Sequence, residues 1–213
     1  MNVKLVSSSQ SIDGYSPEDL VVYMARVSSP NNQTNFKTKE RLIRYMIKHN
    51  HWSPFEMINM CVEIETSKAV AIQILRHKSM SHQELSQRYT EVETYEPIEL
   101  RVQSESNRQS SVDIFEYPDA LFDDRIKEAM ETIFDLYDDM IQSGVARECA
   151  RMILPMATKT KLYMNGNARS FIHYIQERTK ETTQKEHRLV AEKIKEIFVE
   201  LYPTIAAAAF TEE

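Results

Sequence analysis

The chain has 213 residues, a hydrophobic content of 42% and a formal charge of −6 at pH 7. This length suits one domain with an ordinary core, and the acidic balance gives no bulk attraction to nucleic acid. Two cysteines and three glycines are too few for a disulfide framework or a glycine-rich nucleotide-binding loop. No apolar stretch approaches the length of a membrane span, so we expect a soluble cytoplasmic protein.

The first third of the chain has the apolar spacing of short strands and amphipathic helices. Its turn and capping residues fall between these segments, as they do at the ends of regular elements. In chain order we expect a strand over residues 3–6, a helix capped by Ser16 with Pro17 at its first position, a mobile polar loop over 31–35, a helix over 39–50, a half-buried strand over 57–65 and a helix from Ser67 to Leu75.

The rest of the chain begins with a polar stretch and is then largely helical. We expect a solvent-facing excursion over 97–111, a long helix over 119–143 stopped by Gly144, a helix over 145–154, a strand over 158–165, a turn at Gly166, a helix opened by Asn167 and a final helix over 183–202 ending at Pro203. Helices around few strands, without regular alternation, indicate an α+β fold: helices packed on a small, mostly antiparallel sheet in a single domain, residues 1–213.

The segment from Arg76 to Tyr89 is the most informative part of the chain. Between Ser79 and Tyr89 only Met80 and Leu85 are apolar, so we interpret the segment as a surface loop. Its arginines and hydroxyls are groups that bind phosphate, and Glu84 can accept hydrogen bonds from a ribose hydroxyl or a base amide. A dipole-matched helix end alone would explain Arg76, but it leaves the following polar residues unexplained.

The spacing of these residues resembles the signature of the flavin-dependent thymidylate synthases. Arg76, His77 and Lys78 are followed by Ser81, Glu84, Ser86 and Arg88, with Lys78 where the family usually has a second arginine. A second resemblance comprises Arg151 before Pro155, the run Asn167-Ala168-Arg169-Ser170, then Arg178 and Gln184-x-Glu186. Thr182 stands where many members carry histidine, and residues 99–112 have no recognised counterpart. The resemblance runs from about Ala25 to Ile197.

The resemblance implies that the chain converts dUMP to dTMP. FAD reduced by NADPH would donate the hydride, and methylenetetrahydrofolate would donate the carbon, because amino acids supply neither. It also implies a homotetramer with shared active sites and no enzyme nucleophile. Cys61 and Cys149, expected in a strand and an apolar helix, are not near the basic segment in sequence, so we expect neither to be an activated thiol, and Ser81 has no recognisable triad partner.

The resemblance also implies the roles of individual residues. Arg178 would be catalytic, polarising the uracil ring. The expected dUMP-binding residues are Gln73, Ile74, Leu75, Arg76, Glu84, Leu85, Ser86, Gln87, Arg88, Arg151 and Arg178. The expected cofactor-binding residues are Ser53, Arg76, His77, Lys78, Glu84, Asn167, Ala168, Arg169 and His173.

Alternatives remain for both the sites and the function. His49 and His51 have the spacing of metal ligands but no local carboxylate or cysteine to complete a set, and we expect no metal. The same basic segment would also suit a nucleic-acid-binding module, against which the net acidity argues. A homologue that keeps the fold with impaired turnover is the other alternative, suggested by Lys78.

Overall fold

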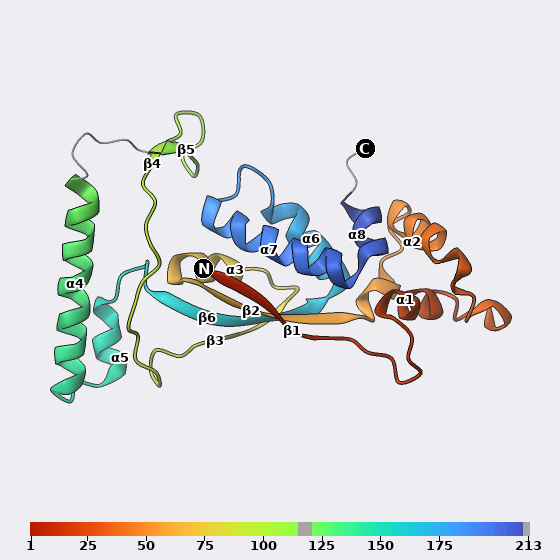
Figure 1. The fold of residues 1–213 in the computed structure, drawn as a ribbon, viewed down its shortest axis with the longest axis horizontal. Coiled ribbons are helices and arrows are strands. Elements are labelled where there is room, and N and C mark those ends of the chain that lie inside the picture. Colours follow the sequence, from red (N-terminus) through yellow and green to blue (C-terminus); the bar gives the residue numbers. More distant parts are fainter. Residues whose placement is uncertain (115–120, 211–213) are drawn as a thin grey trace. The chain divides into compact units, whose positions relative to one another are not determined.

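The computed structural model of the chain describes residues 1–114 and 121–210. A four-stranded sheet has the order β1-β2-β6-β3, formed by Asn2–Ser8, Asn59–Ser67, Lys159–Asn167 and Ser81–Glu84 (Figure 1). A two-stranded ribbon pairs β4, Arg101–Gln103, with β5, Ser111–Ile114, in antiparallel fashion. Helices account for most of the remaining elements, which confirms the predicted α+β class with a small antiparallel sheet.

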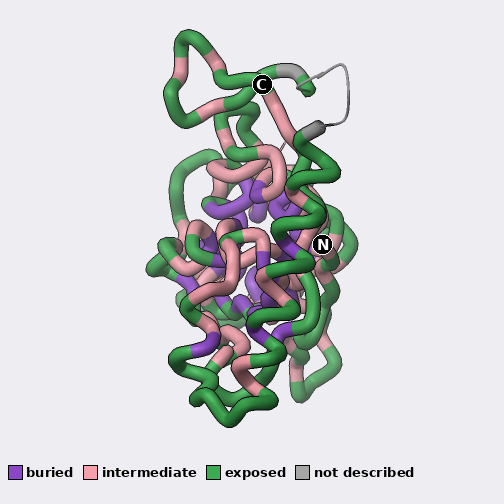
Figure 2. The backbone as a smooth tube through the Cα atoms, turned by 90° about the vertical axis from the view of Figure 1, so that its left-hand side faces the viewer, coloured by how far each residue is buried: buried purple, intermediate pink, exposed green. Residues whose placement is uncertain are grey.

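The chain divides into two compact units, which we describe separately. The first unit comprises Met1, Glu65–Ile74 and Glu84–Leu162, and the second comprises Asn2–Ile64, Leu75–Gln83 and Tyr163–Glu213. That residues 1–213 form a single domain stays a prediction. Buried residues lie in the interior of the fold, whereas loops and turns are mostly exposed (Figure 2).

Strands β2 and β6 are antiparallel neighbours. Beyond one end of the pair, the Lys68 N–H donates to the Thr158 carbonyl at 2.8 Å, and beyond the other, the Ala168 N–H donates to the Ile58 carbonyl at 3.0 Å. Alternate residues of β6, from Thr160 to Gly166, are buried, as expected when successive side chains point to opposite faces. This register fixes where α6, which follows β6 directly, begins.

The core of the second unit lies between the sheet and five helices: α1 Pro17–Ala25, α2 Lys39–Lys48, α6 Ala168–Arg178, α7 Lys185–Leu201 and α8 Pro203–Ala209. Helix α7 packs on β1, α6 and α8, and α2 packs on α8. Fully buried side chains, among them Phe55, Phe171, Ile194 and Phe198, fill this core. Short 3₁₀ turns, η1 Pro30–Asn32, η2 Phe36–Thr38 and η3 Ser53–Glu56, connect α1, α2 and β2.

Helix starts in this unit follow the capping rules that the sequence suggested. The Ser16 hydroxyl accepts from the Asp19 N–H at 3.1 Å, with Pro17 at the first position of α1.

The prediction that the chain ends with one helix at Pro203 is wrong, because Pro203 begins α8. The buried Glu18 carboxylate satisfies the start of that helix by accepting from the Ile205 N–H at 2.8 Å.

The first unit contains α3 Lys68–Ile74, α4 Leu121–Gln142, α5 Arg147–Ala150 and the 3₁₀ turn η4 Arg151–Ile153. Helix α4 is the longest in the described residues, and Gly144, with φ of +84°, follows its end as predicted. The predicted start of this helix, at 119 and 120, lies outside the described residues. A continuous helix over 145–154 is wrong: Leu154 is extended, since the residue before a proline is disfavoured in helical conformation.

Other differences from the sequence predictions have local physical causes. The segment after Arg76 is not a loop throughout, because residues 81–84 form edge strand β3, and an edge strand needs backbone partners rather than many apolar residues. The excursion over 97–111 contains β4 and the beginning of β5. The 31–35 loop is tied down by the Arg26 guanidinium, which donates to the Asn32 carbonyl at 3.1 Å and the Thr38 hydroxyl at 2.7 Å.

Gly166 is a strand residue and not the predicted turn. Its neighbour across the sheet is Met80, whose Sδ would lie 2.2 Å from a Cβ added at Gly166. Glycine at this position therefore leaves room for Met80, the apolar residue that the otherwise polar 76–89 segment buries here, and a larger residue would displace the Met80 side chain.

Candidate functional site

Helix α6 and the turn η3 line a partly open cavity of about 590 Å³ in the second unit. Asn167 caps α6, its amide oxygen accepting from the Ser170 N–H at 2.9 Å. Arg169, Ile172, His173 and Gln176 follow at the three- and four-residue spacing of one helical face. The full lining is Trp52, Glu56, Ser79, Asn167, Arg169, Ser170, Ile172, His173 and Gln176.

The charges at this cavity are partly balanced within the protein. The Arg169 guanidinium donates to the Glu56 carboxylate, and both side chains are well exposed. An exposed pair of this kind contributes little to stability, so Arg169 can exchange its partner for an anionic ligand at low cost. The Trp52 indole packs edge-on against Phe55, with ring centroids 5.8 Å apart, and gives the cavity an aromatic wall.

The neighbouring face of α6 carries Tyr174 and Arg178, one turn apart. The Nε of Arg178 donates a hydrogen bond to Nε2 of His77 at 2.8 Å. The His77 ring meets the Tyr174 ring edge-on, with centroids 4.8 Å apart. The Tyr174 hydroxyl lies 3.1 Å from Nε2 of His187, and both of these side chains are fully buried.

The environment keeps both histidines of this cluster neutral. Burial, assisted by the charge of Arg178, lowers the pKa of His77 to about 4. Burial likewise lowers the pKa of His187 to about 3, assisted by Arg178. A neutral imidazole can accept a hydrogen bond at one nitrogen, which is what the geometry at His77 requires.

The other basic residues of the signature are exposed. Arg76 and Lys78 have no ion-pair or hydrogen-bond partner for their side chains within the part of the chain that the structure describes. Ser53 is exposed at the start of η3. Unpaired cations next to an ordered residue such as His77 leave this segment able to bind an anion.

In the first unit, Glu84 is held by two neighbours. Its Oε1 lies 2.7 Å from the Lys68 ammonium and accepts from the Thr160 hydroxyl at 3.1 Å. The Leu85 N–H donates to the Lys161 carbonyl at 2.8 Å, which extends the sheet pairing past β3. Glu84 is therefore oriented before any ligand binds.

The two predicted phosphate-binding arginines differ in their partners. Arg88 lies 3.1 Å from Glu148, and both side chains are mostly exposed. Arg151 is half-buried in η4 and has no side-chain partner in residues 1–114 and 121–210. The Ser86 hydroxyl accepts from the Arg88 N–H at 3.4 Å. A half-buried arginine without a partner is the better candidate for holding a phosphate.

Five of the predicted site residues come together in the second unit. Asn167, Arg169 and His173 line the cavity, and His77 and Arg178 contact each other beside Tyr174. Ile74 and Ala168 are buried, so they can offer a ligand only their backbone. By unit, Gln73, Ile74, Glu84, Leu85, Ser86, Gln87, Arg88 and Arg151 belong to the first, and Ser53, Leu75, Arg76, His77, Lys78, Asn167, Ala168, Arg169, His173 and Arg178 to the second.

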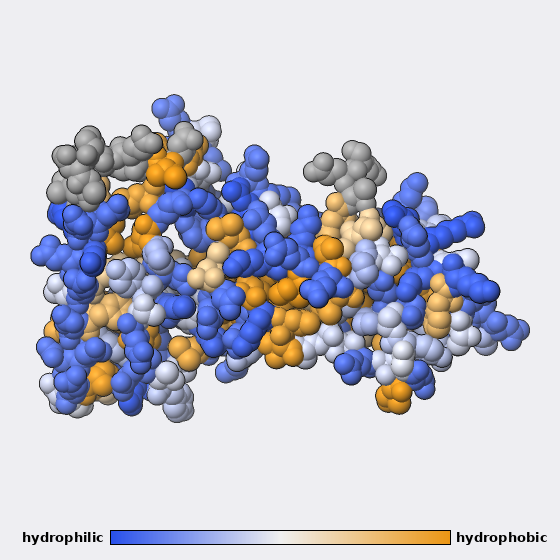
Figure 3. All heavy atoms as spheres, in the orientation of Figure 1, coloured by the Kyte–Doolittle hydropathy of each residue, from blue (hydrophilic) through white to orange (hydrophobic). Residues whose placement is uncertain are grey.

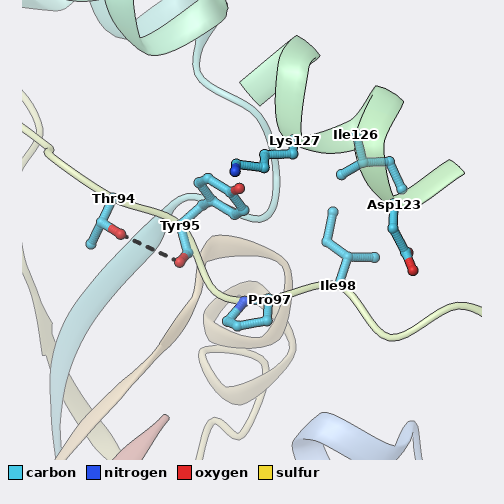
Figure 4. A pocket seen from close by; sticks show the side chains of 7 residues that line it. All are labelled: Thr94, Tyr95, Pro97, Ile98, Asp123, Ile126 and Lys127. Carbon is cyan, nitrogen blue, oxygen red and sulfur yellow. Dashed lines mark hydrogen bonds between the residues drawn. The ribbon is translucent and has the colours of Figure 1, made fainter. Parts of the chain in front are cut away.

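A second hollow, of about 390 Å³, lies in the first unit between residues 94–98 and α4 (Figure 4). Ile98 and Ile126 point toward each other across it, and the Tyr95 ring lies beside Lys127. Tyr95 also packs against Phe134, with centroids 6.0 Å apart. None of the predicted site residues lines this hollow, and its contacts join α4 to the 94–98 segment.

The two cysteines differ in their exposure. Cys61 is half-buried in β2, and burial raises its pKa. Cys149 is exposed in the four-residue α5, which corrects its predicted place in an apolar helix. Among the described residues no group of histidines, cysteines and carboxylates is arranged to hold a metal ion, and no helix there has the length and apolarity needed to cross a membrane.

Comparison with known proteins identifies the class. The family model described as thymidylate synthase complementing protein matches residues 11–204. A flavin-dependent thymidylate synthase of Synechocystis sp. is 45% identical over 214 residues, covering 98% of this chain and 99% of the relative. A probable flavin-dependent thymidylate synthase of Paramecium bursaria Chlorella virus 1 is 43% identical over 212 residues, covering 98% of each chain.

Solved structures agree with this assignment. The UMP/dUMP methylase PolB from Streptomyces cacaoi, solved with 5-Br dUMP, has a TM-score of 0.82 and 30% identity, covering 97% of this chain and 93% of that one. The fold is thus that of a nucleotide-modifying enzyme family. The chain belongs to the thymidylate synthase complementing protein family, whose relatives above are named flavin-dependent thymidylate synthases. The resemblance predicted from the Arg76–Arg88 signature is confirmed.

Several residues at these sites were not predicted from the sequence. Ile172 and Gln176 share the helical face of Arg169 and His173, so their spacing was a usable signal. Tyr174 lies four residues before Arg178, so the helical spacing could also have placed it beside that residue. His187 had no local signal, because its contact with Tyr174 depends on the packing of α7 against α6.

Proposed function

We propose that the chain is a flavin-dependent thymidylate synthase that converts dUMP to dTMP, with FAD as hydride carrier, NADPH as reductant and methylenetetrahydrofolate as carbon donor. The proposal is carried by the near full-length identity of 45% to a relative of that name, together with a cavity lined by three of the cofactor residues that the resemblance implies.

The residues at the cavity fit FAD. A volume of about 590 Å³ lies in the range of small-molecule sites. Its lining combines an aromatic wall, Trp52, with polar groups and the guanidinium of Arg169 at the start of α6, where the helix dipole favours a phosphate. The exposed Arg76 and Lys78 would add positive charge. When bound, FAD supplies the hydride that reduces the transferred carbon.

The substrate dUMP needs a phosphate site and a group that stabilises charge on the ring. Arg151, assisted by Arg88 and Ser86, would hold the phosphate, and the oriented Glu84 would accept a ribose or base hydrogen bond. Arg178 would donate to the uracil ring and stabilise the negative charge that develops as the ring becomes nucleophilic. The nucleotide analogue in the Streptomyces cacaoi methylase supports a nucleotide of this size and charge.

We further propose that no enzyme nucleophile attacks the ring. A nucleophilic cysteine needs a lowered pKa and access. Burial raises the pKa of Cys61 and so disfavours its thiolate, whereas Cys149 is exposed and has no role in the proposed reaction. In this proposal the pyrimidine ring reacts without a covalent bond to the protein.

A homotetramer with shared active sites completes the proposal. Large hydrophobic side chains are exposed in the first unit, among them Tyr89 at 85%, Met152 at 78% and Leu136 at 51%. Hydrophobic groups also interrupt the hydrophilic surface in Figure 3. Exposed apolar residues of this size support association with other copies of the chain. The cytoplasmic location expected from the sequence stays a prediction.

The test is a thymidylate assay on the purified protein after FAD content is measured from its visible spectrum. We expect a yellow protein that forms dTMP only when dUMP, methylenetetrahydrofolate and NADPH are all present. Failure to take up added FAD at micromolar concentration would overturn the cofactor assignment. A flavin-loaded protein without turnover would favour the impaired homologue, and salt-sensitive DNA binding without flavin would favour the nucleic-acid module.

The same assay should be run with UMP in place of dUMP. The structural neighbour is described as a UMP/dUMP methylase and was also solved with 5-Br UMP. Because the more similar relatives are named thymidylate synthases, we expect dUMP to be the preferred substrate. Equal turnover of both nucleotides would show that this chain does not discriminate at the sugar.

A further inference from the structure

We propose that His77 is a positioning residue for Arg178, and that the buried Tyr174–His187 pair holds the His77 ring in the orientation this requires. The proposal rests on the proposed function, in which Arg178 acts on the uracil ring. It goes further by assigning a role to Tyr174 and His187, and a second role to His77 besides its expected contact with FAD.

The hydrogen bond between the two residues selects which donors of Arg178 remain free. Arginine has five N–H donors in a planar fork. Nε is engaged by His77 at 2.8 Å, which leaves the Nη1 and Nη2 groups for a ligand. Arg178 makes no ion pair with a carboxylate in the described residues, so its charge is oriented without being neutralised.

His77 can serve as this acceptor only in one state. Since Nε2 accepts from Arg178, the ring must be neutral, with its proton on Nδ1. The groups that bear on it electrostatically are Arg178, His173 and His82, which disfavour a second proton, and Glu177, which favours one. Burial disfavours the charged ring most strongly. The acceptor state therefore persists at neutral pH.

The Tyr174–His187 pair forms a rigid support for the ring. Tyr174 and His187 are fully buried, and their polar atoms meet at 3.1 Å. The His77 and Tyr174 rings pack edge-to-face at an interplanar angle of 78°. Tyr174 cannot move without breaking its contact with His187. It therefore restricts the rotation of the His77 ring that packs against it.

A positioning role of His77 predicts an effect on turnover that a purely structural packing role does not. A catalytic group held by a neighbour loses effectiveness when that neighbour is removed, because small displacements cost large factors in rate. The neighbour should then matter only while the catalytic group is present. The effects of removing His77 and Arg178 on turnover should thus be strongly non-additive.

The first experiment is a double-mutant cycle with His77→Phe, Arg178→Ala and the double variant, all assayed at saturating FAD. Phenylalanine keeps an aromatic edge on Tyr174 but cannot accept a hydrogen bond. We expect His77→Phe alone to lower kcat about 10- to 100-fold, with little further loss when it is added to Arg178→Ala. His77→Gln, which keeps an acceptor oxygen, should retain more turnover than His77→Phe. Additive losses, or equal losses in the Phe and Gln variants, would overturn the proposal.

The second experiment does not depend on activity. In protein labelled with ¹⁵N-arginine, the Arg178 Nε–H should give a protected resonance, identified by its absence in Arg178→Ala. We expect it to shift and exchange faster with water in His77→Phe, and to a smaller degree in Tyr174→Phe. If it is unchanged in His77→Phe, the positioning role is wrong even in an active enzyme. If it responds as expected in a protein that makes no dTMP, the proposed function fails and the contact stands.

Discussion

Arg178 and His77 lie 101 residues apart in sequence, and Nε of the first donates to Nε2 of the second at 2.8 Å. This contact joins the signature segment after α3 to the last residue of α6. It gives the chain an arginine that is oriented by a neutral acceptor, at the end of a helix whose other face lines the candidate cofactor cavity.

Arg178→Ala should reduce turnover while flavin content and much of the dUMP affinity remain. If Arg178 stabilises charge on the ring, its removal should cost about two to three powers of ten in kcat, the scale of a lost oxyanion donor. Arg151→Ala should instead raise the Kd for dUMP, because its unpaired guanidinium is the expected phosphate contact. Steady-state kinetics with dUMP binding measured by calorimetry separates the two, and identical profiles would contradict this division.

Lys78→Arg should tighten FAD binding modestly. Lys78 is exposed and, in the described ranges, makes no salt bridge, so a guanidinium can be introduced without breaking one. A planar fork can form two aligned hydrogen bonds where an ammonium offers one point of contact, and the gain should be at most about 1 kcal/mol. Titration of the apo-protein with FAD measures it. Weaker binding by the arginine variant would mean that this position does not serve the cofactor as in other members.

Stability should fall as the pH is lowered from 7 to 5, in part because of His187. Its pKa is lowered to about 3 in the folded chain from an ordinary 6.5, so the unfolded chain binds a proton that the folded chain excludes. The contribution is complete above about pH 6.5 and is lost progressively as the pH falls toward 3; the stability already lost at pH 5 is about 2 kcal/mol. Urea unfolding should show a smaller loss for His187→Phe over this interval. Equal losses in the two proteins would disprove the effect.

Neither Cys61→Ser nor Cys149→Ser should abolish turnover, because the proposed mechanism uses no thiolate. Cys149 is exposed, so its replacement should leave stability nearly unchanged. Cys61 is half-buried, and a serine hydroxyl there should cost about 1 kcal/mol unless it finds a partner. Thermal unfolding and dTMP formation measure the two effects. A folded, flavin-loaded serine variant without turnover would point to covalent catalysis.

Gly166→Ala should destabilise the fold through Met80. The added Cβ would lie 2.2 Å from the Met80 sulfur, so the side chain or the strand must move, at a cost of about 1–3 kcal/mol. Met80→Ala removes the obstacle, and Gly166→Ala should cost less in that background. Urea unfolding of the four proteins tests this, and an equal cost in both backgrounds would rule out the steric explanation.

The sequence by itself determined the family, the fold class and most helix boundaries. Ser16, Asn167 and Gly144 act through neighbours within a few residues, so their capping and terminating roles can be read locally. The signature spacing from Arg76 to Arg88 was equally local. These features needed no knowledge of long-range contacts.

Only the tertiary structure decided the roles that depend on pairing across the chain. Edge strand β3 exists because Leu85 and Met80 find partners near β6, and Gly166 is a packing residue because Met80 lies beside it. Helix α8 begins at Pro203 because Glu18, far away in sequence, accepts from its first turn. The support of Arg178 by His77, Tyr174 and His187 has the same origin. Burial and hydrogen bonding between distant segments set the charge state and orientation of side chains, and no local pattern encodes them.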